Sequence, residues 1–93
     1  MAEIEYDRTK RDRTLQERGL DMERAGGIFD RPHLTAPDLR QDYGEDRFIT
    51  IGYLDGRMVV FVWTWRGKNI RIISIRKANG REQTKYGPRL VGS

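Results

Sequence analysis

The sequence predicts an α+β fold of two layers, in which an antiparallel sheet packs one of its faces on helices and leaves the other face accessible. Three observations predict it: an alternating apolar and charged stretch opens the chain, two helix-forming segments follow, and three β-rich stretches precede a last short helix. The 93 residues suffice for one such domain and are too few for two cores. We therefore expect residues 1–93 to form a single domain.

The first half of the chain contains a short strand and two helices. Residues 2–6 alternate apolar with charged side chains, which is typical of a half-buried strand. Asp7 can cap a helix that Gly19 ends, because a carboxylate accepts hydrogen bonds from the free amides of a first turn. Asp21 begins a second helix by the same chemistry, and Pro32 closes it. The residues expected to be buried on this helix are Met22, Ala25, Ile28 and Phe29.

A loop and a hairpin follow the helices. Residues 33–46 are predicted to be a loop with a short edge strand at His33–Ala36. The runs 48–54 and 57–65 are rich in β-branched and aromatic residues, and Asp55-Gly56 between them is a strong signal for a two-residue hairpin turn. These runs therefore form the first two strands of a meander.

The last strand and the last helix come after this hairpin. A turn at 66–69 leads to a third strand over 70–77. Asn79, followed three residues later by Glu82, matches a capping box that opens a short helix. We expect Gly87-Pro88 to end that helix.

The third strand of the meander carries cations on both of its predicted faces. Strict alternation places Ile70, Ile72, Ser74 and Arg76 on one side, and Arg71, Ile73, Ile75 and Lys77 on the other. An unpaired guanidinium is costly to bury. We therefore expect Arg71 and Arg76 near opposite ends of the strand, each within reach of solvent, a carboxylate or a phosphate.

Composition excludes several classes of protein. Because the chain has no cysteine, it has no disulfide framework, no thiolate nucleophile and no Cys-rich zinc site. It also shows no glycine-rich phosphate motif, no paired-carboxylate spacing typical of a magnesium site and no nucleophile triad, so we expect neither a metal nor a cofactor. No apolar run approaches the ~20 residues of a membrane span, and the acidic start is unlike a signal peptide. These features favour a cytoplasmic location.

The basic charge is concentrated in the last third of the chain. From Arg66 onward, eight Lys or Arg residues accompany one acid, whereas the first 65 residues carry ten basic and thirteen acidic side chains. A polyanion is drawn to such a region, because each neutralised phosphate releases condensed counterions. The charge therefore favours nucleic-acid binding, with a solvated basic surface as the alternative.

Short motifs distributed along nearly the whole chain form one recognisable series. The most specific is Arg71-Ile72-Ile73-Ser74-Ile75-Arg76 followed by Arg81-Glu82. The further stretches are Ile4-Glu5-Tyr6-Asp7 with Lys10, Gly19-Leu20-Asp21-Met22, Phe29-Asp30-Arg31-Pro32, Arg47-Phe48-Ile49-Thr50-Ile51-Gly52, Ala78 and Tyr86. With these motifs in this order, the chain resembles the BrnT toxins. This chain departs from the family pattern at Thr14, at Glu17-Arg18 and at Trp65, where the family usually has Asn, Lys-His and an acidic residue.

The resemblance implies a RelE-like fold and a ribonuclease that arrests growth by cutting RNA and blocking translation. It also implies a partner antitoxin, BrnA, whose ribbon-helix-helix region binds DNA, so that the complex represses its own operon. The alternative is a non-catalytic module that binds nucleic acid or the antitoxin in a repressor complex.

Metal-free RNA cleavage needs phosphate-binding cations, a base for the 2′-hydroxyl and an acid for the departing 5′-oxygen. Arg71 and Arg76 are the candidate phosphate clamps, because a guanidinium offers several fixed donors and stays charged. Glu82 can be the base if a less polar setting raises its pKa, and Tyr86 or Lys10 can supply the proton. Further candidates for RNA binding are Arg66, Lys68, Lys77, Arg81 and Trp65.

Each candidate also has a purely structural interpretation. The two arginines can pair with carboxylates of the helices, and Glu82 can serve as a capping residue. Tyr86 can pack the last helix on the sheet, and the stem of Lys10 can cover apolar surface. His33 has no ligand partner in the sequence. Trp63 and Trp65 share a face of their strand, which is more typical of a core or a partner interface than of catalysis.

Overall fold

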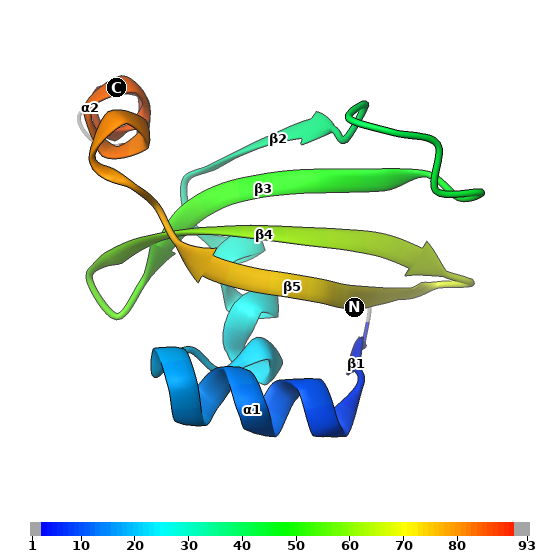
Figure 1. The fold of residues 1–93 in the computed structure, drawn as a ribbon. Helices are drawn as coiled ribbons and strands as arrows, with labels where there is room; N and C mark the ends of the chain where they lie inside the picture. The colour runs from blue at the N-terminus through cyan, green and yellow to red at the C-terminus, as the bar shows by residue number, and fades with distance from the viewer. Residues whose placement is uncertain (1–2, 91–93) are drawn as a thin grey trace.

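The computed structural model describes residues 3–90 (Figure 1). In chain order its elements are β1 (Ile4–Tyr6), α1 (Arg8–Arg18), the 3₁₀ helix η1 (Met22–Asp30), β2 (His33–Pro37), β3 (Arg47–Leu54), β4 (Arg57–Arg66), β5 (Asn69–Lys77) and α2 (Gly80–Leu90). The predicted succession of strand, two helices, edge strand, meander and helix is confirmed. Ala2, part of the predicted first strand, lies outside the described residues, and a single domain over all 93 residues stays a prediction.

The five strands form one sheet in the order β1-β5-β4-β3-β2. The three long strands are antiparallel neighbours, and β2 is the predicted edge strand beside β3. β1 instead runs parallel to β5, with Ile4 opposite Ile70 and Tyr6 opposite Ile72. The sheet is therefore mixed rather than antiparallel throughout. The long connection between β1 and β5 allows this pairing, because parallel neighbours need a crossover rather than a tight turn.

The predicted caps and turns are confirmed at the level of single hydrogen bonds. Asp7 accepts from the amide of Thr9 at 3.1 Å, and Gly19 has a left-handed φ of 69° at the end of α1. Asp55 and Gly56 have φ values of 53° and 78°, as the two central residues of a type I′ hairpin require.

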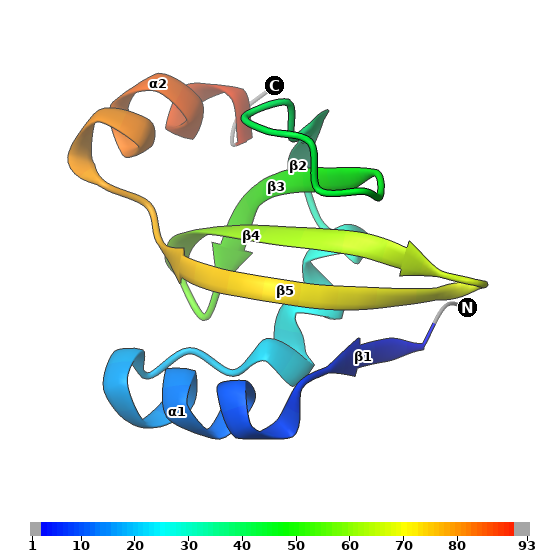
Figure 2. The same ribbon diagram turned by 45° about the vertical axis from the view of Figure 1, so that its right-hand side comes forward.

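The inner face of the sheet packs on η1, and α1 lies on the same side of the sheet and packs against η1 (Figure 2). Its core cluster includes Met22 and Ile28 of η1 and Phe61 and Ile72 of the sheet, each at most 1% exposed. A Cβ atom on Gly52 would lie 2.4 Å from Cγ2 of Ile28. Glycine at this position therefore allows η1 to approach β3 closely.

The second predicted helix is a 3₁₀ helix, which the sequence analysis did not anticipate. Its buried residues Met22, Ala25 and Ile28 recur every third residue, and a 3₁₀ helix with three residues per turn places them on one face. Gly26-Gly27 in its interior also weakens the preference for an α-helix.

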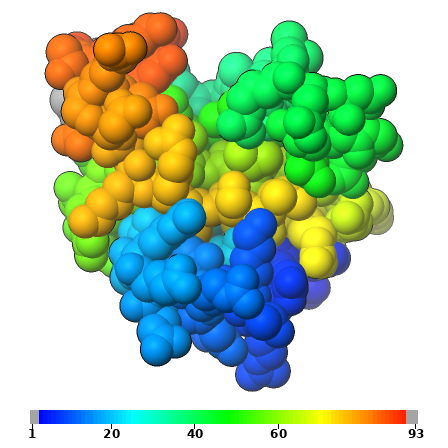
Figure 3. All heavy atoms as spheres, viewed as in Figure 1, coloured from blue at the N-terminus to red at the C-terminus, as the bar shows by residue number. Residues whose placement is uncertain are grey.

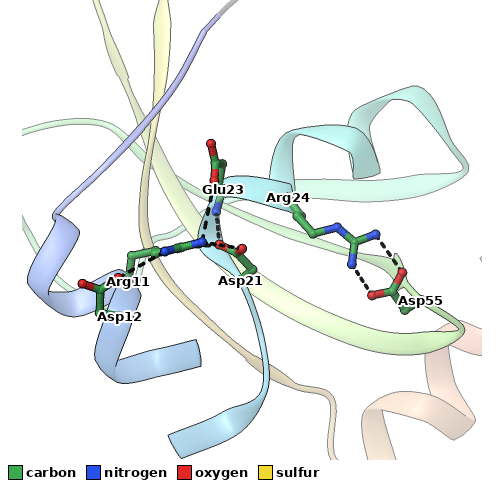
Figure 4. Close-up of polar contacts among 6 residues, drawn as sticks. All are labelled: Arg11, Asp12, Asp21, Glu23, Arg24 and Asp55. Carbon is green, nitrogen blue, oxygen red and sulfur yellow. Dashed lines mark hydrogen bonds and ion pairs between the residues drawn. The ribbon is translucent and has the colours of Figure 1, made fainter. Parts of the chain in front are cut away.

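An ion-pair cluster joins α1 to η1 (Figure 4). Nε and Nη2 of Arg11 donate to the two carboxylate oxygens of Asp21 at 2.8 and 2.7 Å. Asp21 also accepts from the amide of Glu23 at 3.0 Å and so caps η1, as predicted. The hydrogen bonds from Arg11 hold the pKa of Asp21 below its ordinary value. A separate, exposed pair links Arg24 of η1 with Asp55 in the hairpin turn.

The outer face of the sheet is covered at one end by α2 (Figure 1). A second core cluster lies there, formed by Ile51, Met58, Val60, Ala78 and Leu90. The expectation that this whole face stays accessible is therefore wrong. Gly87-Pro88 also does not end the helix, which continues to Leu90. Leu90 is 3% exposed, and its burial stabilises the last turn although Pro88 lacks an amide donor.

A β-bulge in β5 changes the predicted faces of that strand. Two adjacent residues of β4 pair with Ser74 and Ile72, so Ile73 between them is the extra residue. Beyond the bulge the alternation is inverted, and Arg76 lies on the same outer face as Arg71. The prediction of opposite faces for these two arginines is wrong, because it assumed strict alternation of side chains along the strand and the bulge adds one residue.

Candidate functional site

A groove opens on the outer face between α2 and the 38–46 segment (Figure 3). Its volume is about 390 Å³. The apolar and hydroxyl groups that line it belong to Ile49, Ile51, Val60, Val62, Ser74 and Tyr86. The charged side chains that line it are Arg40, Arg76, Arg81, Lys85 and Glu82. We call this cavity the outer groove; its lining carries four cations and one carboxylate.

Arg76 reaches the outer groove from β5 and is bound by Glu82 of α2. Nη1 and Nη2 of Arg76 donate to Oε1 and Oε2 of Glu82 at 2.8 and 2.9 Å. This bidentate pairing raises the pKa of Arg76, while the positive charge of Arg40 acts in the opposite direction. The Arg76 side chain is still 48% exposed, so its guanidinium is accessible from the groove. The pairing with a helix carboxylate is one of the two interpretations given for this residue.

Glu82 combines this ion pair with the predicted capping box. Its amide donates to Oδ1 of Asn79 at 2.8 Å, and its Oε1 accepts from the amide of Asn79 at 2.9 Å. The hydrogen bonds from Arg76 lower the pKa of Glu82 to about 2. This shift is opposite to the raised pKa expected for a general base. The capping role is confirmed.

The remaining groove residues of α2 lie on one side of that helix. Arg81 and Lys85 are four residues apart and both exposed, so they share a face. Tyr86 is partly buried against the second core cluster, which confirms its packing role. Its side chain also lines the outer groove, where the predicted role as a proton donor requires it to be.

Arg71 lies outside the outer groove, although the bulge places it on the same face as Arg76. Four residues of β5 lie between the two, which corresponds to roughly 15 Å along a strand. Because Arg71 does not line the groove, the structure does not bring the two predicted phosphate clamps together. Nη1 of Arg71 lies 4.0 Å from Oε1 of Glu5, its neighbour on β1.

Three of the RNA-binding candidates lie at the opposite end of the sheet, around the turn between β4 and β5. Arg66 donates to Glu45 at 2.8 Å, and Lys68 is exposed in the turn itself. Trp65 is 49% exposed and contacts Trp63 edge to face at a centroid distance of 5.3 Å. Trp63 is buried and belongs to the core, as the interpretation of these tryptophans allows.

The last candidates are dispersed. Lys10 is exposed on α1, and Lys77 is exposed at the end of β5; neither lines the outer groove. His33 is bonded through Nδ1 to the carbonyl of Arg31 at 2.7 Å and packs edge to face on Phe29, which is a structural arrangement.

Sequence reasoning missed Arg40, Ser74 and Lys85 among the groove residues. Arg40 stands in a predicted loop, where nothing in the local pattern indicates which way a side chain points. Lys85 has a signal, because it follows Arg81 by four residues and precedes Tyr86. Within residues 3–90, no three His, Asp or Glu side chains gather into a group that can hold a metal ion.

The fold and the groove define a class: a small α+β protein whose mixed sheet presents a cation-lined groove suited to a phosphate chain. Comparison with known proteins identifies the family. A family model described as the ribonuclease toxin BrnT of type II toxin-antitoxin systems matches residues 6–82. The chain belongs to this family of ribonuclease toxins, which confirms the resemblance inferred from the residues.

A solved structure supports the fold. The ribonuclease toxin BrnT of Brucella abortus matches with a TM-score of 0.67 and 23% sequence identity over 85% of this chain and 99% of that chain. No protein with a curated function matches the sequence. None of the helices in residues 3–90 is long and apolar enough to cross a membrane.

Proposed function

We propose that this chain is an endoribonuclease that cleaves RNA in the outer groove without a metal ion and thereby blocks translation in the cytoplasm. The observation that carries the proposal is Arg76, a half-exposed arginine in a groove whose lining has four cations and a single carboxylate. Phosphodiesters supply the negative charge that such a lining lacks. Magnesium at such sites is usually held by one or two carboxylates together with substrate phosphates, and among the described residues the one carboxylate of the lining, Glu82, is already bound to Arg76. A RelE-like arrangement, implied by the resemblance, is part of the proposal.

The exchange of one partner of Arg76 for another is the first step that we propose. A phosphate entering the groove takes hydrogen bonds from the guanidinium of Arg76 in place of those to Glu82. The guanidinium then stabilises the charge that develops on the phosphate oxygens. Release from Arg76 removes the main cause of the low pKa of Glu82, so its carboxylate becomes a stronger base.

Bond exchange at phosphorus follows. Glu82 takes the proton of the 2′-hydroxyl, the 2′-oxygen forms a bond to the adjacent phosphorus, and the bond from phosphorus to the 5′-oxygen breaks. Tyr86 donates the proton that the departing 5′-oxygen needs. The products are a 2′,3′-cyclic phosphate and a free 5′-hydroxyl. Lys10 and Arg71 take no part in this step because they do not line the groove; Arg71 is proposed to contact RNA farther along the outer face.

A BrnA-type antitoxin with a ribbon-helix-helix region is the proposed partner. Membership in a type II family supports a protein antitoxin in general. Acidic side chains of such a partner can cover the outer face, because the chain is net positive from Arg66 onward and net negative before it. Operator DNA is then reached through the antitoxin.

A cleavage assay with purified protein tests the proposal. We expect wild type to cut a single-stranded RNA at the same rate with and without EDTA, and Arg76→Ala to lose activity. Arg57→Ala is the matched control, because Arg57 is exposed and pairs with Leu54, a residue of the inner-face core. Cleavage that EDTA abolishes contradicts the metal-free chemistry, and full activity of Arg76→Ala contradicts the site.

Controlled expression in bacteria tests the biological part. We expect wild type to arrest growth with loss of RNA integrity, Arg76→Ala to permit growth, and co-expression of the neighbouring gene to relieve the arrest. Folded wild-type protein that binds RNA or the antitoxin without cleavage and without toxicity favours the non-catalytic module instead.

A further inference from the structure

The wall of the outer groove that faces α2 is formed by the 38–46 segment (Figure 3). In the space-filling view this green lobe and the orange lobe of α2 stand on either side of the hollow. Arg40 is the residue of the segment that lines the groove, and its side chain is 65% exposed. The proposed cleavage chemistry uses no residue of this wall.

Asp38 holds Arg40 in place from beneath. The side chain of Asp38 is completely buried. Nε and Nη2 of Arg40 donate to its two oxygens at 2.8 and 2.7 Å, and the backbone amide of Arg40 donates to Oδ1 at 3.2 Å. These three contacts fix both the backbone and the guanidinium of Arg40, so little rotamer freedom remains to be lost when a ligand binds.

The rest of the segment secures Asp38. Its amide donates to the carbonyl of Arg47 at 2.8 Å, and the hydroxyl of Tyr43 donates to its Oδ2 at 3.1 Å. The guanidinium of Arg47 lies over the Tyr43 ring, 4.2 Å from the centroid. Hydrogen bonds and a cation–π contact therefore hold the 38–46 segment to itself and to the start of β3.

The geometry leaves one edge of the Arg40 guanidinium for a ligand. A guanidinium has five N–H donors, and Asp38 accepts from Nε and Nη2. Within residues 3–90, no acceptor bonds to Nη1 of Arg40. The edge formed by Nη1 and the second Nη2 hydrogen can bind two oxygens of a phosphate.

Arg40 and Arg76 act on the same cavity from different walls. Both line the groove, and the charge of Arg40 opposes the protonation of Arg76, which places the two cations within Coulombic range of each other. Two like charges held at one cavity repel, and an anion between them relieves the repulsion. Asp38 and Glu82 offset part of the two charges, but Asp38 is buried behind Arg40, so the space between the two guanidinium groups is left for an anion.

We propose that Arg40 binds a backbone phosphate of the RNA next to the one that Arg76 holds, and that Asp38 is the positioning residue that fixes Arg40 for this contact. This inference rests on the proposed function and extends it to the second wall of the groove. RNA thus crosses the groove between α2 and the 38–46 segment, with one phosphate on each side.

Binding of a non-cleavable RNA tests the inference. The probe is a fluorescent single-stranded oligonucleotide in which 2′-O-methyl groups replace the 2′-hydroxyls, measured by anisotropy at several salt concentrations. For Arg40→Gln we expect affinity to fall about fivefold to tenfold, and the slope of log affinity against log salt to shrink by about 0.7, the value for one phosphate contact on a single strand. Arg57→Gln, with the same charge change on the inner face, should leave both quantities nearly unchanged.

The direction in which Asp38→Asn changes RNA affinity distinguishes a positioning role of Asp38 from a simple effect of its charge. Charge alone predicts tighter RNA binding by this variant, because it removes a negative charge beside the groove. Positioning predicts weaker binding, by about threefold or more, because the guanidinium loses its charged bidentate partner. Tyr43→Phe removes only the hydroxyl donated to Asp38 and should weaken binding in the same direction by a smaller factor, which keeps the test decisive if Asp38→Asn does not fold.

The outcomes separate this inference from the proposed function. Wild-type binding with equal affinities for Arg40→Gln and Arg57→Gln overturns the inference alone. Tighter binding by folded Asp38→Asn overturns the positioning role. If wild type cleaves in the groove, as Arg76→Ala reports, while Arg40→Gln binds normally, the proposed function stands without the second wall. A wild-type protein that binds no RNA overturns both.

Discussion

Two arginine–carboxylate pairs in this molecule have nearly the same internal geometry and different surroundings. Arg11 and Asp21 meet through hydrogen bonds of 2.7 and 2.8 Å between α1 and η1, and Arg76 and Glu82 through bonds of 2.8 and 2.9 Å in the outer groove. In both pairs the carboxylate also accepts a backbone amide near the start of a helix. The hydrogen bonds within each pair therefore do not distinguish a structural pair from a functional one.

The neighbours distinguish the two pairs. Asp12 and Glu23 lie within 3.1 and 3.7 Å of the Arg11 guanidinium, so this cation is surrounded by acids (Figure 4). Its side chain is 24% exposed, against 48% for Arg76. Arg76 instead shares its cavity with Arg40, Arg81 and Lys85. Acidic neighbours hold Arg11 in its pair with Asp21, whereas the cationic neighbours of Arg76 favour the exchange that we propose, of Glu82 for a phosphate.

The largest expected effect is on catalysis. Arg76→Lys should lower the rate of RNA cleavage on the order of 100-fold, because an ammonium group cannot present two parallel donors to phosphate oxygens. Arg11→Lys should leave the rate of cleavage unchanged, since the ion pairs of Arg11 among the described residues are with Asp12, Asp21 and Glu23, away from the outer groove. Initial rates on one RNA substrate measure both. Equal losses in the two variants would mean that the pairs do not differ in function.

The next effect is on stability. Asp21→Ala should lower the free energy of unfolding by about 1–2 kcal/mol, because it removes the cap of η1 and the partner of Arg11. Cleavage by the folded variant should stay at the wild-type rate. Urea unfolding followed by tryptophan fluorescence measures the loss. Asp12→Ala is the control, because Asp12 is 60% exposed and caps no helix, and a loss equal to that of Asp21→Ala would contradict the structural role.

Much of the fold was predictable because its signals are local. Asp7, Gly19 and Asp55-Gly56 each determine a cap or a turn through backbone conformation or a hydrogen bond two residues away. The capping box of Asn79 and Glu82 is equally local. Such features require only neighbours in sequence, and all of them were found.

Apart from the 3₁₀ form of η1, the errors concern features that depend on distant parts of the chain. The parallel pairing of β1 depends on where a long crossover returns, and the last turn of α2 depends on a hydrophobic cluster that receives Leu90. The bulge at Ile73 moves Arg76 to the face of Arg71, although the strand pattern itself gives no sign of it. The sequence therefore predicted the residues of the candidate site one by one, without their arrangement in space. The predicted residues that lie together in the groove are Arg76, Arg81, Glu82 and Tyr86.

A third prediction concerns acid pH. The pKa of Glu82 in the folded protein is about 2, below the value of about 4.3 expected in the unfolded chain. A lowered pKa contributes stability that is fully present above the unfolded value and is lost as the pH falls through the folded value. The stability difference between wild type and Glu82→Gln should therefore be constant above about pH 5 and shrink from there toward pH 2. With solvent screening of the half-exposed Arg76, we expect roughly 1 kcal/mol in total.

Urea unfolding at several pH values measures this difference. Asp21 gives the companion curve, since its pKa is also lowered and its pair is less exposed. A difference for Glu82→Gln that grows as the pH falls would show that the carboxylate is not stabilised by Arg76 in the folded protein.

The smallest effect is expected for the exposed bidentate pair between Arg24 and Asp55. Both side chains are more than half exposed, at 54% and 56%, so water screens their attraction and competes for their hydrogen bonds. Asp55→Asn removes the negative charge and keeps a residue that tolerates the positive φ of 53° in the hairpin turn. We therefore expect no measurable change in melting temperature or in RNA cleavage, whereas Asp55→Val should destabilise the hairpin because a β-branched residue is strained at that φ. A clear loss of stability in Asp55→Asn would show that bidentate geometry stabilises this fold even where both side chains are exposed. The neighbouring charges would then no longer explain the difference between the Arg11–Asp21 and Arg76–Glu82 pairs.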